Sequence, residues 1–172
     1  DSDQGRYKEV SFIDAFARSS NVAFSSVVFD NYSQNPGKYI GHLKKLGLDK
    51  RTGIEILGEP EPKLNHPESG SWSSLTLPWL GIGYENQHTP LQLLTAYNGI
   101  INDGQMLRPQ IVEKVTDAGI IIRNIDAENR PVQVCSKETS LKVRQLTAAV
   151  VDHGSGSNIK STIVQLAGKT GT

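Results

Sequence analysis

The sequence predicts an α+β fold in which helices pack on a mostly antiparallel sheet. Apolar residues recur at helical spacing in several segments before residue 102, which indicates a run of amphipathic helices. A β-hairpin pattern follows at residues 111–125, and then a further helix and a final strand. Helices first, then a hairpin, a helix and a strand are typical of α+β proteins. With 172 residues the chain is long enough for one domain with a sizeable core.

Composition excludes several classes of protein. The chain carries 18 basic and 18 acidic residues and has no long basic run, so nothing indicates a nucleic-acid partner. The single cysteine, Cys135, excludes an internal disulfide. The 4 histidines lie far apart and lack metal-ligand spacing, so we expect no metal site. No apolar run is long enough to span a bilayer, and we find no signal peptide.

The first helix is predicted at residues 10–18 and the second from residue 22 to about residue 29. Ser19, Ser20 and Asn21 separate them. Two interpretations of this tripeptide stay open. It is either a helix N-cap, which its residue types alone favour, or a hydroxyl and an amide presented to a ligand at a helix junction.

The middle of the chain begins with a helix at residues 36–46, which Gly47 ends. Residues 52–67 are rich in glycine and proline and predict an irregular surface loop. The aromatic, serine-rich stretch at residues 72–79 is either the wall of a cleft or part of the core, and core packing is the commoner case. Residues 81–84 predict a tight turn, and their two glycines alone are weak evidence for phosphate binding.

The second half predicts three regular elements before the final strand. Thr89 and Pro90 open a strongly apolar helix that we expect to be central, and residues 102–104 close it. The hairpin turns at residues 117–119. A last helix covers residues 136–153, capped by Ser136 and ended by Gly154, and the residues expected to face inward are Leu141, Leu146, Ala149 and Val150.

The final strand carries the most suggestive chemistry. Val164, Leu166 and Ala167 read as its buried part, and the chain then continues with Lys169, Thr170, Gly171 and Thr172. A cation, two hydroxyls and a glycine without a Cβ atom fit a sheet edge that receives an anionic, peptide-like ligand. The alternative is a strand that simply runs into a turn.

Two motifs in order suggest a family. Ser19-Ser20-Asn21 matches S-x-N and Lys169-Thr170-Gly171 matches K-T-G, and the segments between them, such as residues 81–84 and 89–93, also fit. From about Ser11 onward the chain resembles the transpeptidase domain of class B penicillin-binding proteins. Two further matches are interpreted as coincidence: Ser33-Gln34-Asn35 as a turn, and the S-x-x-K at residues 157–160 because it follows Ser19 in a glycine-rich loop.

The resemblance implies a penicillin-binding-protein and serine β-lactamase-like fold and a serine D,D-transpeptidase of peptidoglycan synthesis. Its ligands would be stem peptides ending in D-Ala-D-Ala and β-lactam antibiotics, its partners other cell-wall synthesis or division proteins, and it would need no cofactor. Ser19 would relay a proton, Asn21 would bind the substrate amide, and Lys169 would supply the electrostatic field. Thr170, Gly171 and Thr172 would bind the substrate, with the Thr172 N–H in the oxyanion hole.

One departure shapes the expectations for this chain. No S-x-x-K precedes Ser19, so the nucleophile is expected upstream, residues 1–172 are expected to be a partial domain cut at both ends, and the isolated segment is expected to be inactive. The resemblance favours the division-type branch, with an inner-membrane anchor and a periplasmic catalytic domain in the parent protein. Alternatives are a D,D-carboxypeptidase or β-lactamase of the same fold, and a non-catalytic β-lactam sensor or interaction domain.

Overall fold

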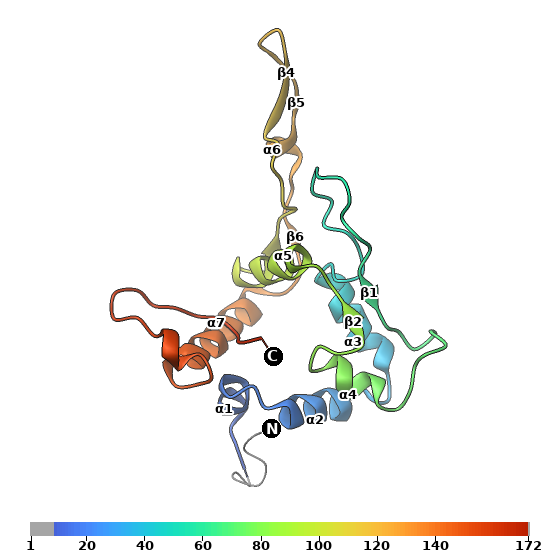
Figure 1. Ribbon diagram of the computed structural model, residues 1–172, viewed down its shortest axis with the longest axis vertical. Coiled ribbons are helices and arrows are strands. Elements are labelled where there is room, and N and C mark those ends of the chain that lie inside the picture. The colour runs from blue at the N-terminus through green and yellow to red at the C-terminus, as the bar shows by residue number, and fades with distance from the viewer. Residues whose placement is uncertain (1–8, 172) are drawn as a thin grey trace. The chain divides into compact units, whose positions relative to one another are not determined.

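A computed structural model describes residues 9–171 (Figure 1). Its helices are α1 (Phe12–Ala17), α2 (Asn21–Tyr32), α3 (Pro36–Lys45), α4 (Thr76–Leu80), α5 (Pro90–Ile101), α6 (Ile125–Glu128), α7 (Lys137–Asp152) and the 3-10 turn η1 (Ser157–Ile159). Its strands are β1 (Lys63–Leu64), β2 (Asn86–Gln87), β3 (Gln105–Met106), β4 (Lys114–Asp117), β5 (Ile120–Asn124) and β6 (Val132–Gln133). None of the helices in this part of the chain has the length and apolar character needed to cross a membrane.

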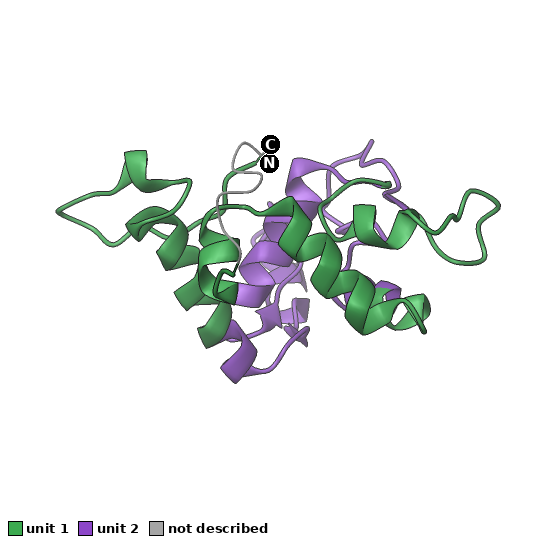
Figure 2. Cartoon of the chain, turned by 90° about the horizontal axis from the view of Figure 1, so that it is seen from below, with its two compact units in different colours: residues 1–39, 65–85, 141–172 green, residues 40–64, 86–140 purple. Residues whose placement is uncertain are grey.

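The strands of the described residues pair two by two, and each pair is antiparallel: β1 with β2, β3 with β6, and β4 with β5. Helices together with antiparallel strands confirm the predicted α+β class. The chain divides into two compact units, shown in Figure 2. Unit 1 comprises residues 1–39, 65–85 and 141–172, and unit 2 comprises residues 40–64 and 86–140.

Unit 1 is built around α2, which packs against α1 and α4. The Phe24 ring lies 5.8 Å from the Phe12 ring and 5.7 Å from the Phe16 ring, which joins α2 to α1. At the other end of α2, a Cβ atom on Gly81 would lie 2.9 Å from Val28 Cγ2, so only glycine lets the end of α4 approach α2 so closely.

A backbone hydrogen bond joins the segment after α7 to the end of α1. The Ser155 N–H donates a hydrogen bond of 2.8 Å to the Ala17 carbonyl oxygen. A Cβ atom on Gly154 would overlap that same carbonyl oxygen, so the two backbones touch with no room for a side chain. Residues 17–19 and 154–155 therefore form one junction within unit 1.

Unit 2 contains α5, whose start follows the sequence prediction closely. The Thr89 hydroxyl accepts from the Gln92 N–H, the Gln92 side chain accepts from the Thr89 N–H, and Pro90 stands in the first turn. The prediction that α5 is central holds for one face only. Ala96 and Gly99 are buried, whereas Leu94 is 63% exposed and Tyr97 is 39% exposed.

The predicted hairpin is confirmed as β4 and β5. Its three consecutive isoleucines are exposed, with Ile120 at 70%, and no third strand pairs with β4 or β5 within the described residues. The tip is tight: Ala118 and Gly119 both have positive φ angles, as two-residue hairpin turns of this hand require.

Three predictions, for the final strand, for Leu141 and for the loop at residues 52–67, need correction. The final strand is absent: residues 161–171 form neither strand nor helix, because no described strand lies beside them to receive backbone hydrogen bonds. The Gly168 N–H donates instead to the Thr147 carbonyl oxygen at 3.1 Å. Leu141 was expected to face inward but is 46% exposed, although Ala149 and Val150 of the same helix are buried. The loop at residues 52–67 is irregular as predicted except for β1.

Candidate active site

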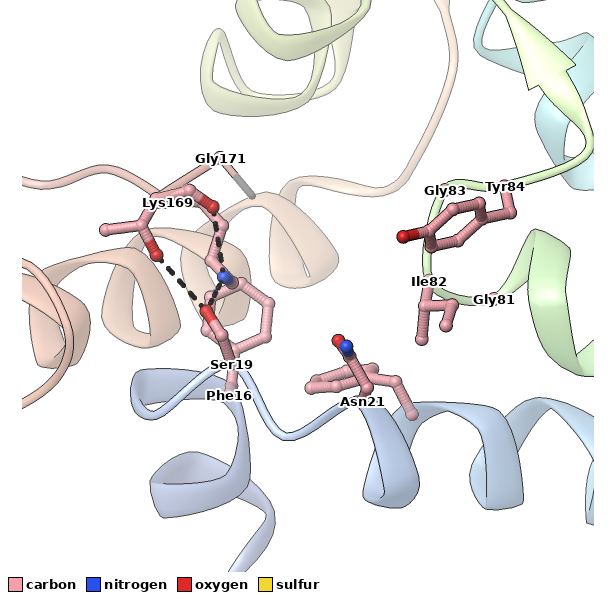
Figure 3. Close-up of a pocket in the computed structure, with 11 residues that line it drawn as sticks. Phe16, Ser19, Asn21, Gly81, Ile82, Gly83, Tyr84, Lys169 and Gly171 are labelled. Carbon is pink, nitrogen blue, oxygen red and sulfur yellow. Dashed lines mark hydrogen bonds between the residues drawn. The ribbon is translucent and has the colours of Figure 1, made fainter. Parts of the chain in front are cut away.

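A cavity of about 560 Å³ lies within unit 1 (Figure 3). It is lined by three segments that are far apart in the sequence: the α1–α2 region, the turn after α4, and the chain near residue 170. The lining residues are Phe16, Ser19, Asn21, Phe24, Gly81, Ile82, Gly83, Tyr84, Lys169, Thr170 and Gly171. The cavity therefore brings the S-x-N and K-T-G motifs into one site.

Ser19 occupies an unusual backbone position between α1 and α2. Its φ angle is +56°, in the left-handed region that favours glycine. Two hydrogen bonds close the end of α1: the Ser19 N–H donates to Phe16 O at 3.1 Å, and the Ser20 N–H donates to Ala15 O at 2.9 Å. This pair of bonds is the Schellman motif, in which a glycine commonly takes the place that Ser19 has here.

The two interpretations of Ser19-Ser20-Asn21 apply to different residues of the tripeptide. Ser20 is the N-cap of α2, and its hydroxyl accepts from the Ala23 N–H at 3.4 Å. Ser19 and Asn21, on either side of it, line the cavity. One short segment thus both starts a helix and presents two polar side chains to the site.

A chain of polar contacts joins the two motifs. The Lys169 ammonium donates a short hydrogen bond to the Ser19 hydroxyl oxygen, drawn as a dashed line in Figure 3. The Ser19 and Thr170 hydroxyl oxygens lie 3.2 Å apart, and the Thr170 hydroxyl lies 2.8 Å from that of Ser155. Ser155 is held by its own backbone bond to Ala17, so the order runs Ser155, Thr170, Ser19, Lys169.

Lys169 is the half-buried cation of this site. Burial lowers the pKa of its ammonium group, because a charge is less stable in a less polar environment. The ammonium lies 5.9 Å from the centroid of the Phe16 ring and also donates to the Thr170 carbonyl oxygen at 3.4 Å. A lysine with a lowered pKa releases its proton more readily than an exposed lysine does.

Residues 81–84 form the opposite wall of the cavity, as Figure 3 shows. Trp79 packs edge to face against Tyr84, with ring centroids 5.5 Å apart, so the aromatic stretch at residues 72–79 supports this wall. Leu77 and Leu80 of α4 are buried, which means that the stretch also contributes to the core. Both interpretations of that segment therefore hold in part.

The structure brings together Ser19, Asn21, Lys169, Thr170 and Gly171 of the predicted site residues, and Thr172 lies outside the described residues. No described atom lies within 4 Å of the place where a Gly171 Cβ would be, which leaves open space beside the backbone. Sequence reasoning did not single out Ser155 or Tyr84 as site residues. The two glycines at positions 81 and 83 marked that wall only as a turn.

The coincidental motif matches lie elsewhere. Ser33 caps the end of α2, and Asn35 precedes α3, as expected of a connection. Ser157 begins η1 and is not among the residues that line the cavity, and the Lys160 ammonium pairs with Asp152 at 3.4 Å. Within residues 9–171, no group of three or more His, Cys, Asp or Glu side chains is placed to hold a metal ion.

The fold and the cavity define a class of protein: a mixed helical and antiparallel domain in which an S-x-N serine and a K-T-G lysine share one cavity. Comparison with known families assigns this class. Residues 1–172 match the family model of the penicillin binding protein transpeptidase domain. The chain belongs to this family, and the resemblance inferred from its motifs is confirmed.

Individual relatives agree with the assignment. The chain is 34% identical over 164 residues to penicillin-binding protein PbpB of Mycobacterium tuberculosis, covering 91% of this chain and 23% of that protein. It is 28% identical over 144 residues to stage V sporulation protein D of Bacillus subtilis, covering 78% of this chain and 21% of that protein. The chain thus spans under a quarter of the length of these curated relatives.

Solved structures show the same relationship. The crystal structure of penicillin binding protein 3 of Mycobacterium tuberculosis complexed with ampicillin superposes with a TM-score of 0.78 at 31% identity, covering 92% of this chain and 35% of that chain. The same protein complexed with aztreonam gives a TM-score of 0.74 at 30% identity, covering 88% of this chain and 34% of that chain.

Proposed function

We propose that this chain is part of a peptidoglycan D,D-transpeptidase that works through a serine acyl-enzyme and is a target of β-lactams. The observation that carries the proposal is the contact between the Lys169 ammonium and the Ser19 hydroxyl, 150 residues apart, at one cavity. The substrate would be a stem peptide ending in D-Ala-D-Ala. The relatives named above support a role in cell-wall synthesis, and we place the parent protein at the division branch, anchored in the inner membrane.

The attacking serine belongs to the S-x-x-K motif, which does not occur before Ser19 in this sequence. Another part of the parent polypeptide supplies it in this proposal. The serine oxygen attacks the penultimate D-Ala carbonyl carbon, and its proton passes to the lysine of the same motif. The carbonyl oxygen becomes an oxyanion, stabilised by the Thr172 N–H in the oxyanion hole.

Ser19 and Lys169 then protonate the leaving group. When the C–N bond breaks, the leaving nitrogen of the terminal D-Ala takes the proton of the Ser19 hydroxyl, and Lys169 Nζ returns a proton to the Ser19 oxygen it already contacts. An amine from a second stem peptide attacks the acyl-enzyme and gives up its proton along the reverse route. The peptide cross-link forms and the catalytic serine is regenerated.

The remaining groups position the substrate. The Asn21 carboxamide hydrogen-bonds the substrate amide, and the Thr170 hydroxyl, together with that of Thr172 and the charge on Lys169, binds the terminal carboxylate. Ser155 holds Thr170 at 2.8 Å and so acts as a positioning residue. Open space beside Gly171 lets the backbone of the substrate lie along this segment.

The proposal is tested by intact mass spectrometry after incubation with benzylpenicillin. The longest natural polypeptide that carries this sequence is compared with the 172-residue chain, and each is also made with Ser157→Ala. We expect one adduct on the long form, mapped to a serine of an S-x-x-K motif outside residues 1–172, and none on the short chain.

Two outcomes would contradict the proposal. An adduct on the short chain that Ser157→Ala removes would place the nucleophile at the motif interpreted as coincidence. No adduct on either form would favour a non-catalytic sensor or interaction domain of the same fold. In both cases the roles given to Ser19, Asn21 and Lys169 would be withdrawn.

A further inference from the structure

A second cavity, of about 150 Å³, lies entirely within unit 2. The end of α3, the middle of α5, and the chain around β3 and β6 surround it. Its described lining includes no acidic residue and four basic ones: Lys50, Arg51, Arg108 and Arg130. We call it the basic pocket.

Two of the four cations are already neutralised. Arg51 Nε lies 3.0 Å from Glu61 Oε1, and Arg108 Nη2 lies 3.7 Å from Glu55 Oε1. Among residues 9–171, neither Lys50 nor Arg130 has an ion pair or a side-chain hydrogen bond. The basic pocket thus keeps two cations, Lys50 and Arg130, that form no ion pair with a carboxylate of the described residues.

The backbone around these cations is held in place by other contacts. The Asn129 side chain exchanges two hydrogen bonds with the backbone of Arg108, at 2.8 Å and 3.2 Å, and so fixes the segment next to Arg130. On the other side, Glu59 accepts from the N–H groups of Thr52 and Gly53, at 2.8 Å and 3.2 Å. The segments that carry the four cations are therefore arranged before any ligand arrives, which lowers the cost of binding.

A buried amide also reaches this cavity. Gln92 is 2% exposed and lines the basic pocket, yet its Nε2 group has only a 3.5 Å contact with the Pro60 carbonyl oxygen, at the limit of a hydrogen bond. Buried polar groups usually have stronger partners. The rest of the wall is partly apolar, with Leu46, Met106, Leu107 and Val132.

We propose that the basic pocket binds a small phosphate-bearing anion, such as a diphosphate or a phosphate monoester. Two cations without an ion-pair partner match a ligand with two negative charges, which a phosphate monoester approaches near pH 7 and a monocarboxylate does not. The planar Arg130 guanidinium can pair with two phosphate oxygens at once, and Gln92 Nε2 can donate to a third. This ligand site is separate from the cavity of unit 1 and does not depend on the proposed transpeptidase activity.

Isothermal titration calorimetry with inorganic pyrophosphate tests the proposal on the longest natural polypeptide that carries this sequence, at a fixed salt concentration. The variant is Lys50→Gln with Arg130→Gln, and the matched control is Arg123→Gln, a cation of the same unit that pairs with Glu128 and does not line the basic pocket. We expect one-to-one binding by the wild type and the control, and binding at least roughly tenfold weaker in the double variant. Circular dichroism verifies the fold, and each single substitution serves if the double variant fails to fold.

Two further arms identify the anion. Succinate tests a dicarboxylate, and phosphatidylcholine vesicles with and without phosphatidic acid test a lipid headgroup as the source of the phosphate. Vesicle binding that needs phosphatidic acid and is lost in the double variant would support the proposal with a lipid as the source. The proposal is overturned if neither phosphate form binds, if the double variant binds as tightly as the control, or if succinate binds as well as pyrophosphate.

Discussion

Two helices of this protein end in the same way but with different residues. At the end of α1, the N–H groups of Ser19 and Ser20 donate to the carbonyl oxygens three and five residues earlier. At the end of α3, the N–H groups of Gly47 and Leu48 do the same, at 2.9 Å and 3.2 Å. The residue in the left-handed conformation is Ser19 in the first case, with φ +56°, and Gly47 in the second, with φ +71°.

The difference is one of stability, because Ser19 and Gly47 do not adopt a positive φ angle at the same cost. Glycine adopts a positive φ angle freely, whereas another residue pays about 1 kcal/mol or more for it. Gly47 ends α3 without this cost. Ser19 ends α1 with the cost, and its hydroxyl contacts Lys169 and Thr170. Backbone strain that other parts of the fold hold in place is a frequent property of functional sites.

The largest expected effect comes from removing the Ser19 hydroxyl. We expect Ser19→Ala and Ser19→Gly, made in the longest natural polypeptide, each to slow acylation by benzylpenicillin by roughly 100-fold, because the proton relay is lost. In the same pair, the glycine variant should have a free energy of unfolding about 1 kcal/mol higher than the alanine variant. Stopped-flow acylation kinetics and urea denaturation measure the two quantities.

The pair separates the hydroxyl from the backbone. If Ser19→Gly retained the wild-type acylation rate, the Ser19 hydroxyl would have no part in acylation, and residue 19 would matter only for the backbone turn between α1 and α2. If the alanine and glycine variants unfolded at the same urea concentration, Ser19 would carry no strain in solution.

A smaller effect is expected from the partner of that hydroxyl. Burial holds the pKa of Lys169 below its ordinary value of 10.5, so acylation should fall as pH rises through this lowered pKa. Lys169→Arg should remove this alkaline decline, because the guanidinium stays charged, and should slow acylation roughly tenfold at neutral pH, because it does not return a proton. A pH profile of acylation by both forms measures this, and an identical alkaline decline in the arginine variant would assign it to another group.

The same pKa sets the sign of a stability effect. The unfolded chain keeps the Lys169 proton to a higher pH than the folded chain does. The contribution of Lys169 to the free energy of unfolding is therefore least favourable below its folded pKa, and it improves as pH rises toward 10.5.

Giving α3 the kind of ending that α1 has should destabilise the protein. We expect Gly47→Ala to lower the free energy of unfolding by about 1 kcal/mol. An alanine would have to keep the left-handed backbone conformation of Gly47, and its Cβ atom would lie 3.3 Å from Met106 Cε. The matched control is Gly41→Ala inside the same helix, where no atom lies within 4 Å of the added Cβ and alanine should stabilise by about 0.5 kcal/mol. Equal effects of the two substitutions in urea denaturation would contradict the comparison.

The smallest effect is expected next to Ser19. Ser20→Ala removes the N-cap of α2, whose hydrogen bond is long at 3.4 Å, and should lower the free energy of unfolding by about 0.5 kcal/mol. Acylation should stay unchanged, because the Ser20 side chain is not among those that line the cavity. A loss of acylation similar to that of Ser19→Ala would mean that the two serines act together.

Local sequence signals were enough for much of the fold. Thr89, Pro90 and Gln92 start α5 through contacts within four residues, and the hairpin turn and the Ser136 cap are equally local. The S-x-N and K-T-G tripeptides identified five cavity residues because their order and spacing match a family. Leu141 was misplaced because apolar periodicity gives the faces of a helix but not which of them another part of the chain covers.

Other features depend on contacts that no short segment contains. Ser155 belongs to the site because Gly154 can touch Ala17, which is far away in the sequence. The wall at residues 81–84 belongs to it because Gly81 lets α4 approach Val28. The strand predicted at residues 164–171 had suitable residues, but strand formation needs a neighbour to receive its hydrogen bonds.

The long separation between Ser19 and Lys169 has a consequence for biosynthesis. Contacts so distant in sequence close a large loop and form late in folding. Helices α1 and α2 leave the ribosome early, but Ser19 cannot contact Lys169 until residue 169 has also emerged. A nascent chain whose synthesis has paused before residue 169 therefore has Ser19 without its lysine contact, and its cavity is incomplete.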